Sequence, residues 1–575
     1  MTKSICKLAI LFTISSLCLI LGSCKTKQTQ QVNQIEFSTE YGVVYYDIFF
    51  EIDPIEGIFR SDQKVSITGN LAEGNKLAIY IGKELVIDNI TLENELGTEF
   101  SVLNWEKVDS YSIDYWWGKC DFSKIEIQTK ETIPPHERLL LNLTYHLPEE
   151  EIQEGLAENM YNLFVGPTGS HAGGPESGAF PLVSGNLSAP FSITIKHPST
   201  FQCALPGERV VQEDNSGYTT VTYQTKTPYD PSYSCAAYRI LSEESGAIQI
   251  ELFTPAHLDL ASEMVTTASQ ILLMYQELFG RPPANSFRVV FPDLNNDKGG
   301  GESNGNIVFL ADIQPFLHDN DDEEAREIFA HLIAHEGYHL WNTWGLNWEG
   351  PLAEWWVEGG ANFMASWAKE ILFGDEYGVR NRLLHIKDYI VQEAYLHKNN
   401  LAGLDDSWFD DWALVYDYGA LVWEQLRQKI GDDAMKAGLH DFYETYGNQN
   451  VNYNDFIKCM EKYTEVDVAA SLEQWTQHNA KINLILHDVI IQEVGEVYEV
   501  EALLEIDSDR DYELFTALGY KTSKSDDWHL IDLHFEESGR YSIIFVSYEM
   551  PQEILFDPEY RVPQINLDDN SWTED

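Results

Sequence analysis

The sequence His-Glu-Gly-Tyr-His at residues 335–339 constrains this chain more than any other stretch. Residues 321–344 are expected to form one helix, so His335 and His339 lie on the same face of it, one turn apart. Both imidazoles can then reach a single zinc ion. Glu358 follows after a gap of eighteen residues and supplies the third protein ligand that a catalytic zinc site usually has. The pattern therefore predicts two neighbouring helices that converge on one zinc ion per chain.

A carboxylate lies beside the first of these histidines. Glu336 is placed to take a proton from a metal-bound water, whose pKa zinc lowers toward ~7. Short patterns of this kind also arise by chance on helices, but the spacing of Glu358 and the glycine-rich loop at 299–301 favour a metal site. His331, one turn before His335, is expected to be a neutral packed or exposed histidine rather than a ligand, because three ligands complete the set. The ligand types favour zinc without excluding cobalt or manganese.

Length and charge limit what the whole chain can be. With 575 residues it is too long for one core, and with 44% hydrophobic residues it is globular. A formal charge of −56 repels nucleic acid, so nucleic acid is excluded as a partner. No obligate protein partner is evident. The predicted organisation is a signal peptide at 1–24, a tether at 25–35, a β domain at 36–250, a zinc-binding catalytic domain at 251–480 and a C-terminal β domain at 481–575.

The N-terminal residues predict export. Lys3 and Lys7 precede an apolar run at 8–21, which is too short to span a membrane. The following Leu-Gly-Ser-Cys, which ends at Cys24, resembles the lipobox of bacterial lipoproteins. That resemblance implies cleavage before Cys24, lipid modification of its thiol, and anchoring to the bacterial cell envelope, at the outer membrane or the cell surface. An ordinary secretory signal with an incidental cysteine is the alternative.

Short alternating or apolar runs predict strands on both sides of a helical centre. Before residue 250 they are separated by Gly, Asn, Pro and Asp turns. A helix at 259–279 and strands at 286–291 and 306–310 follow, then helices at 353–367 and within 416–478. Strands return at 489–504, 529–534 and 541–548, which predicts a small β-sandwich.

Four cysteines remain after the predicted processing: Cys120, Cys203, Cys235 and Cys459. Export permits disulfides, but sequence spacing alone does not pair these residues. None has the Cys-x-x-Cys spacing of a thiolate metal site. Free buried thiols are therefore the default expectation.

Several motifs together resemble one known family. Residues 335–342, with Trp-Trp-Val-Glu-Gly-Gly at 355–360, look like the HExxH-x18-E signature of the aminopeptidase N-like gluzincins. Residues 299–303 fall where that family has its Gly-x-Met-Glu-Asn motif, and residues 416–420 where it has Tyr-x-Lys-Gly. The similarity extends over 36–478. The related glycyl aminopeptidases, with a Gly-Gly-x-Glu-His motif, are an alternative, because the Trp-Asn after the second histidine looks more like that branch.

The resemblance implies a fold and a partner. The fold would be multidomain α+β, with an N-terminal β-saddle-like domain, a thermolysin-like, mostly helical catalytic domain and a small C-terminal β-sandwich. The partners would be peptide substrates.

The resemblance also implies roles for single residues. His335, His339 and Glu358 would bind zinc, with Glu336 as the general base. Tyr416 would donate its hydroxyl to the oxyanion of the tetrahedral intermediate. Glu302 would bind the free α-amino group of the substrate, and Gly300 and Gly301 would let the substrate backbone lie against a strand edge.

The chain departs from the family pattern at three positions. Gly301 stands in place of Met, Ser303 in place of Asn, and Tyr418 in place of the Lys after the catalytic Tyr. The family's large helical C-terminal domain also has no counterpart in the residues after 481. An aminopeptidase is the first expectation, because His335, Glu336, His339, Glu358 and Tyr416 all match the family pattern. The alternatives are an endopeptidase on the same zinc centre, if Glu302 does not capture the amine, and a non-catalytic surface lipoprotein that uses the fold for binding.

Overall fold

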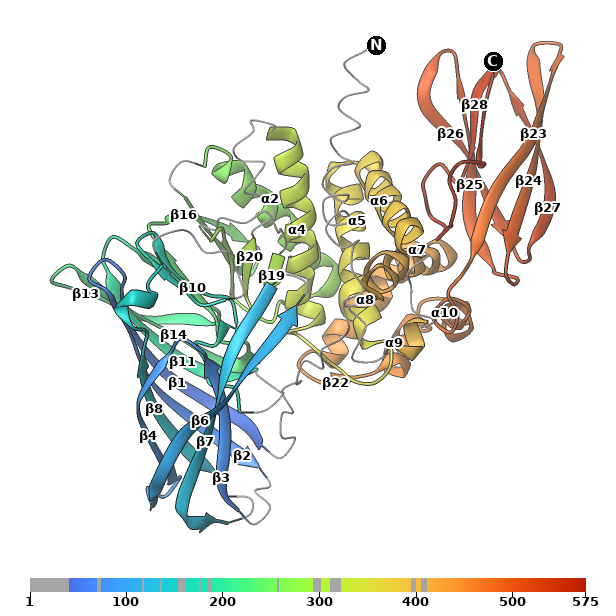
Figure 1. Cartoon of the computed structure of the whole chain (residues 1–575). Helices are drawn as coiled ribbons and strands as arrows, with labels where there is room; N and C mark the ends of the chain where they lie inside the picture. The colour runs from blue at the N-terminus through green and yellow to red at the C-terminus, as the bar shows by residue number, and fades with distance from the viewer. Residues whose placement is uncertain are drawn as a thin grey trace.

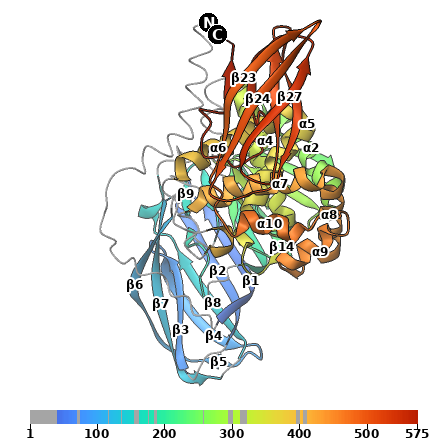
Figure 2. The same cartoon turned by 90° about the vertical axis from the view of Figure 1, so that its right-hand side faces the viewer.

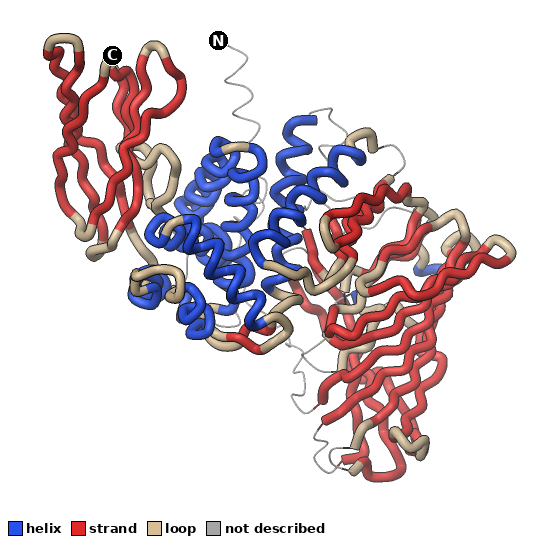
Figure 3. The backbone as a smooth tube through the Cα atoms, turned by 180° about the vertical axis from the view of Figure 1, so that it is seen from behind, coloured by secondary structure: helices blue, strands red, loops and turns tan. Residues whose placement is uncertain are grey.

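A computed structural model describes residues 41–69, 74–115, 118–134, 137–153, 162–174, 177–183, 188–255, 258–292, 301–310, 322–393, 400–404 and 411–574. Strand-built regions lie at the two ends of the molecule, with helices between them (Figures 1 and 3). The predicted signal peptide, Cys24 and Gly300 lie outside the described residues. Within the described ranges, no helix combines the length and the hydropathy that crossing a membrane requires.

The N-terminal region is built on an eight-stranded sheet of order β13-β14-β11-β1-β2-β8-β4-β5. Strands alternate between core and surface, as in β8, whose Leu139, Leu141 and Leu143 are fully buried. Its strands are β1 (Tyr41–Asp53), β2 (Ile58–Gly69), β4 (Val86–Asn94), β5 (Glu99–Phe100), β8 (Leu139–His146), β11 (Ala189–Pro198), β13 (Glu208–Asn215) and β14 (Tyr218–Tyr229). β1 pairs with β11 in parallel and with β2 in antiparallel orientation.

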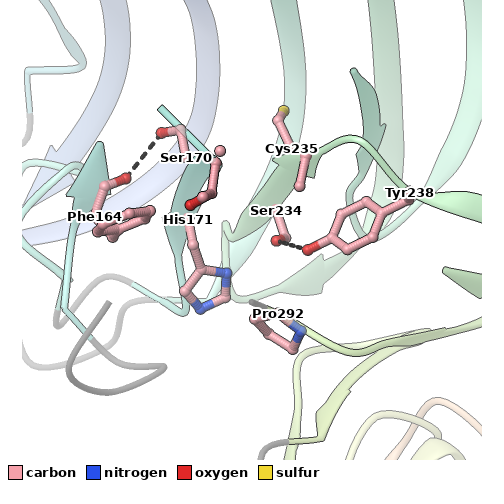
Figure 4. Close-up of a pocket in the computed structure, with 10 residues that line it drawn as sticks. Phe164, Ser170, His171, Ser234, Cys235, Tyr238 and Pro292 are labelled. Atoms are coloured by element: carbon pink, nitrogen blue, oxygen red, sulfur yellow. Dashed lines mark hydrogen bonds between the residues drawn. The ribbon is translucent and has the colours of Figure 1, made fainter. Parts of the chain in front are cut away.

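Two smaller sheets complete this region. One contains β3 (Gly74–Gly82), β7 (Gly118–Ile133) and β6 (Val102–Tyr115); the other contains β12 (Gln202–Ala204), β15 (Tyr233–Ala236), β10 (Gly169–Ala172) and β9 (Phe164–Gly166). The four-stranded sheet β12-β15-β10-β9 lines a cavity of about 10 Å³, which has room for at most one water molecule. Figure 4 shows Ser170 and Ser234 at its wall, bonded to Phe164 and Tyr238. The cavity is too small for a substrate.

The default expectation of free thiols is wrong for two cysteines. Cys203 of β12 and Cys235 of β15 lie directly opposite each other in the small sheet and form a disulfide. The strand register creates this pairing, so spacing along the chain could not reveal it. Cys459 is a free, buried thiol.

The central region contains the sheet that positions the site. Its order is β16-β17-β18-β20-β19, with β17, β18 and β20 parallel and β19 antiparallel at the edge. The strands are β16 (Arg239–Ser245), β17 (Ile248–Thr254), β18 (Ser286–Val290), β19 (Gly301–Ser303) and β20 (Ile307–Leu310). The helices α2 (Ala261–Phe279) and α4 (Asp322–Asn342) confirm the helices predicted at 259–279 and 321–344.

Within the described ranges, six further α-helices follow α4 in the chain. They are α5 (Gly360–Phe373), α6 (Asp375–Glu393), α7 (Gly419–Ile430), α8 (Asp432–Tyr446), α9 (Tyr453–Met460) and α10 (Val468–Thr476). The helix predicted at 353–367 begins with a π-helical segment, η3 (Trp355–Gly359), and a second one, η6 (Leu414–Tyr418), precedes α7. Two short strands, β21 (Asn347–Trp348) and β22 (Asn450–Val451), pair in parallel.

The C-terminal region consists of two sheets packed together, with strands of both labelled in Figure 1 and β23, β24 and β27 toward the viewer in Figure 2. One has β23 (Ile482–Val494), β24 (Val497–Ser508) and β27 (Gly539–Ser547); the other has β25 (Leu514–Thr522), β26 (Ser525–Phe535), β28 (Pro551–Phe556) and β29 (Ser571–Thr573). The strand predicted at 489–504 is a hairpin, which turns at Gly495 with φ 70°. Gln425 of α7 bonds to the backbone N–H and C=O of Phe515, so this region is fixed to the helices.

Candidate metal centre

The structure brings the three predicted zinc ligands together. His335 and His339 project from one face of α4, and their Nε2 atoms lie 3.3 Å and 3.5 Å from Oε2 of Glu358 in η3. A tetrahedral zinc ion with ligands at roughly 2.1 Å has ligand–ligand separations of about 3.4 Å. Both histidine–glutamate distances match this spacing, all three donor atoms lie within 4.8 Å of one another, and all are largely shielded from solvent.

The other nitrogen of each imidazole is held by an oxygen acceptor. His335 Nδ1 lies 2.8 Å from Oδ1 of Asn362, and His339 Nδ1 lies 3.1 Å from both Asn342 Oδ1 and Thr343 Oγ1. An Nδ1–H that donates to these oxygens leaves the Nε2 lone pair for a metal ion. Sequence reasoning did not identify these acceptors. Asn342 and Thr343 follow the second ligand on the same helix, so helical spacing could have indicated them.

Charge interactions inside the centre are strong. Burial disfavours the charged form of His339, but the Glu358 carboxylate outweighs burial and raises the pKa of His339 to about 9. Burial would raise the pKa of Glu358, yet the two histidines hold that pKa well below its usual range. Without metal, a proton on His339 therefore balances the Glu358 carboxylate. Since a metal ion must displace that proton, metal binding should weaken as the pH falls.

The predicted base, Glu336, lies in the wall of the centre. Its side chain is buried, and burial raises the pKa of its carboxyl, against the opposing effect of His335 and His339. A raised pKa suits a group that must accept and return a proton near neutral pH.

Gly301 of β19 lies directly against this carboxylate. A Cβ atom at Gly301 would come within 2.4 Å of Glu336 Oε1 and 2.8 Å of its Cδ. The family's Met would not fit beside Glu336 in this arrangement. The glycine therefore lets the base pack against the edge strand.

Replacing Gly301 with alanine is expected to displace the Glu336 carboxylate and to lower kcat on the order of tenfold, because misplacement by about 1 Å is costly in catalysis. Zinc content should not change, since the three atoms nearest to the added Cβ all belong to Glu336, which is not one of the ligands. Steady-state kinetics together with metal analysis would check this. Gly42→Ala is the folding control, since Gly42 also lies in a strand and is not among the positive-φ glycines, but the nearest atom to its Cβ position is 4.0 Å away. A Gly301→Ala protein with unchanged kcat would contradict the contact.

Tyr416 reaches the centre from η6. Its ring stacks on His335, with centroids 6.0 Å apart and planes 7° from parallel. Burial and the carboxylates of Glu358 and Glu336 raise the pKa of Tyr416 well above its ordinary value. The phenol therefore remains a hydrogen-bond donor at all physiological pH values.

The segments that carry Glu358 and Tyr416 touch through two glycines. A Cβ atom on Gly359 would lie 2.8 Å from the Val415 carbonyl oxygen, and one on Gly419 would lie 3.3 Å from Gly359 Cα. The indole of Trp355 donates to the Gly419 carbonyl at 3.1 Å. η3 and η6 thus pack backbone against backbone, and π-helical turns often occur at functional sites.

The predicted amine-binding residue, Glu302, lies on the edge strand β19. The Asn304 side-chain amide donates to Glu302 Oε1 at 3.0 Å, which fixes the carboxylate. At the departures from the family pattern, Ser303 accepts a hydrogen bond from the Trp344 indole at 3.2 Å, and the Tyr418 hydroxyl donates to the Trp475 carbonyl at 2.9 Å. These residues thus have structural partners.

His331 is a packed histidine, as expected. Its Nδ1 accepts from the Asn381 amide at 2.9 Å. Burial lowers its pKa well below the ordinary value, so it is neutral and stays outside the ligand set.

Three features together define the gluzincin class of zinc metallopeptidase domain. They are a pair of histidines on one helix, a glutamate ligand from the following helical segment, and a glutamate beside the first histidine. Residues 264–475 match the model of the Peptidase family M1 domain.

Similar proteins agree with this assignment. The chain is 24% identical over 421 residues to aminopeptidase N of Lactobacillus helveticus, covering 68% of this chain and 47% of that protein. It is 25% identical over 226 residues to aminopeptidase N of Lactococcus lactis subsp. lactis, covering 36% of this chain and 25% of that protein. The chain thus spans half or less of the length of these relatives.

A solved structure shares the fold. The M1 zinc metallopeptidase from Deinococcus radiodurans aligns with a TM-score of 0.55 at 15% identity, covering 76% of this chain and 95% of that one.

Proposed function

We propose that this protein is a zinc aminopeptidase that removes residues from the N-termini of peptides. The observation that carries the proposal is the convergence of two imidazoles and one carboxylate at zinc spacing, with Glu336 and Tyr416 at the same centre. The M1 zinc metallopeptidase from Deinococcus radiodurans, which shares the fold, supports the choice of metal.

Each side chain has a physical task in this reaction. Zinc, when bound, supplies a Lewis acid that polarises the substrate carbonyl and acidifies water. Glu336 takes the proton of the attacking water and passes it to the departing amine. The Tyr416 hydroxyl donates to the oxygen that gains charge, and such a donor contributes about 3 kcal/mol. Asn362 and Asn342 keep the two ligand imidazoles oriented.

Exopeptidase specificity would come from Glu302. A carboxylate that pairs with a free α-amino group recognises a charge found only at a chain end. Because Glu302 lies on an edge strand, the substrate backbone can add to β19 while its amine reaches the carboxylate.

The test compares a peptide with a free N-terminus and its N-acetylated form. We expect kcat/KM to be at least about a hundredfold higher for the free amine, since a charge-assisted bond is lost on acetylation. Glu302→Gln should remove most of this difference and keep its zinc. Equal rates on both peptides in the wild type would favour the endopeptidase alternative, and no hydrolysis of either by the zinc-loaded protein would favour a binding role.

We also propose that the mature protein is anchored at the bacterial cell envelope through a lipid on Cys24. The Leu-Gly-Ser-Cys sequence after the apolar run supports this. Membrane fractions should retain the wild type and release a Cys24→Ser variant; equal retention of the two would argue against the anchor.

A further inference from the structure

A buried line of hydrogen bonds runs behind the metal centre from α5 to η6. Asn362 holds His335 through its side chain, and its backbone carbonyl accepts from Ser366 Oγ at 3.2 Å. Ser366 Oγ lies 3.3 Å from His385 Nε2, and His385 Nδ1 lies 2.8 Å from Asp417 Oδ1. His385 is 5% and Asp417 3% exposed, so the line passes through the core.

Burial determines the protonation of the His385–Asp417 pair. It lowers the pKa of His385 to about 4 and raises that of Asp417 well above its ordinary value. Burial thus favours the neutral form of both groups, and with both neutral the Asp417 hydroxyl donates to Nδ1 of His385. The Nε2–H of His385 then donates to Ser366, whose hydroxyl donates to the Asn362 carbonyl. Each hydrogen bond in this line then has one donor and one acceptor.

The second carboxyl oxygen of Asp417 supports this assignment. Asp417 Oδ2 is buried, and among the described residues it has no hydrogen-bond partner. An unpaired oxygen costs far less on a neutral acid than on a carboxylate. A line made of neutral groups avoids that cost.

Three successive side chains of η6 are fixed by three different neighbours. Tyr416 stacks on His335, Asp417 bonds to His385 of α6, and the Tyr418 hydroxyl donates to the Trp475 carbonyl. A π-helical turn competes with an ordinary α-helical turn, which would rotate each of these side chains to a new direction. Asp417 directly follows Tyr416 in the chain, and its bond to His385 joins two buried side chains of different helical segments.

We propose that His385 and Asp417 are positioning residues for Tyr416: their hydrogen bond holds η6 in the π-helical register that keeps the Tyr416 hydroxyl beside the zinc ligands. This inference rests on the proposed function for the role of Tyr416 as oxyanion donor. It assigns to a buried polar pair a task that packing alone would not need, because an apolar pair of similar volume would fill the same core.

The test is a double-mutant cycle in the zinc-loaded full chain. Asp417→Leu is expected to lower kcat about tenfold with KM within about twofold, and Asp417→Asn, whose amide can still donate to His385, to restore most of it. In a Tyr416→Phe background, Asp417→Leu should cost less than about twofold, since the hydroxyl it positions is already gone. An equal loss in both backgrounds, or no rescue by asparagine, would overturn the proposal.

A binding readout separates this proposal from the proposed function. Acetohydroxamate, whose oxygens bind zinc, can be titrated calorimetrically into each zinc-loaded variant whether or not peptides are cleaved. Tyr416→Phe and Asp417→Leu should each weaken its binding about tenfold, and the double variant should bind no more weakly than either. Wild-type affinity in Asp417→Leu would refute the positioning role.

A matched control accounts for the loss of a buried histidine. His197 of β11 is 2% exposed, is bonded to the Pro198 carbonyl and, like His385, has its pKa lowered by burial. His385→Leu and His197→Leu should both lower Tm, but only His385→Leu should weaken acetohydroxamate binding. If both or neither weaken it, His385 does not act through Tyr416.

Discussion

Replacing Glu336 with glutamine is expected to lower kcat by roughly a thousandfold while leaving zinc content unchanged. Glutamine has nearly the same shape, so it fits against Gly301, but it cannot accept a proton from water. None of the three ligand atoms is altered, since they belong to His335, His339 and Glu358. Steady-state kinetics and metal analysis of the same preparation would measure both effects.

Glu323→Gln is the matched control for this variant. Glu323 is an exposed carboxylate in the first turn of α4, and its loss should not change turnover. A Glu336→Gln protein that keeps more than about a tenth of wild-type kcat would show that another group accepts the proton.

Replacing His339 with alanine is expected to abolish stoichiometric zinc binding and, with it, peptide hydrolysis. Only two of the three protein ligands would remain, too few for a usual catalytic zinc site. In the wild type, zinc at a hundred times its Kd should stabilise the fold by about 2.7 kcal/mol, and a chelator should remove that gain. Thermal unfolding with and without zinc would therefore show a shift in Tm that the variant lacks.

His331→Ala is the control on the same helix. His331 is buried and bonded to Asn381, so its loss should lower Tm but leave one zinc ion per chain. If His339→Ala still bound one zinc ion with wild-type affinity, the ligand assignment would be wrong.

The sequence predicted the parts of the centre that depend on local periodicity. Two histidines four residues apart on a helix must share a face. The turn that follows α4 lets the next helical segment bring Glu358 close to them. The alternating apolar pattern likewise predicted strands such as β8. These features need only the geometry of one element or of two consecutive ones.

Contacts between elements that are distant in the chain could not be predicted from the sequence. The Cys203–Cys235 bridge depends on strand register, and the Asp417–His385 bond joins helical segments 32 positions apart. The contact between Gly301 and Glu336 likewise appears only once β19 packs on α4. Tertiary packing determines these contacts, and no periodic pattern in a single sequence indicates them.

The glycine contact between Gly359 and Gly419 has a mechanical consequence. Because main chain meets main chain there, the relative positions of Glu358 and Tyr416 are set by the backbone. Changes in side-chain packing elsewhere should then leave the distance between the carboxylate and the hydroxyl unchanged.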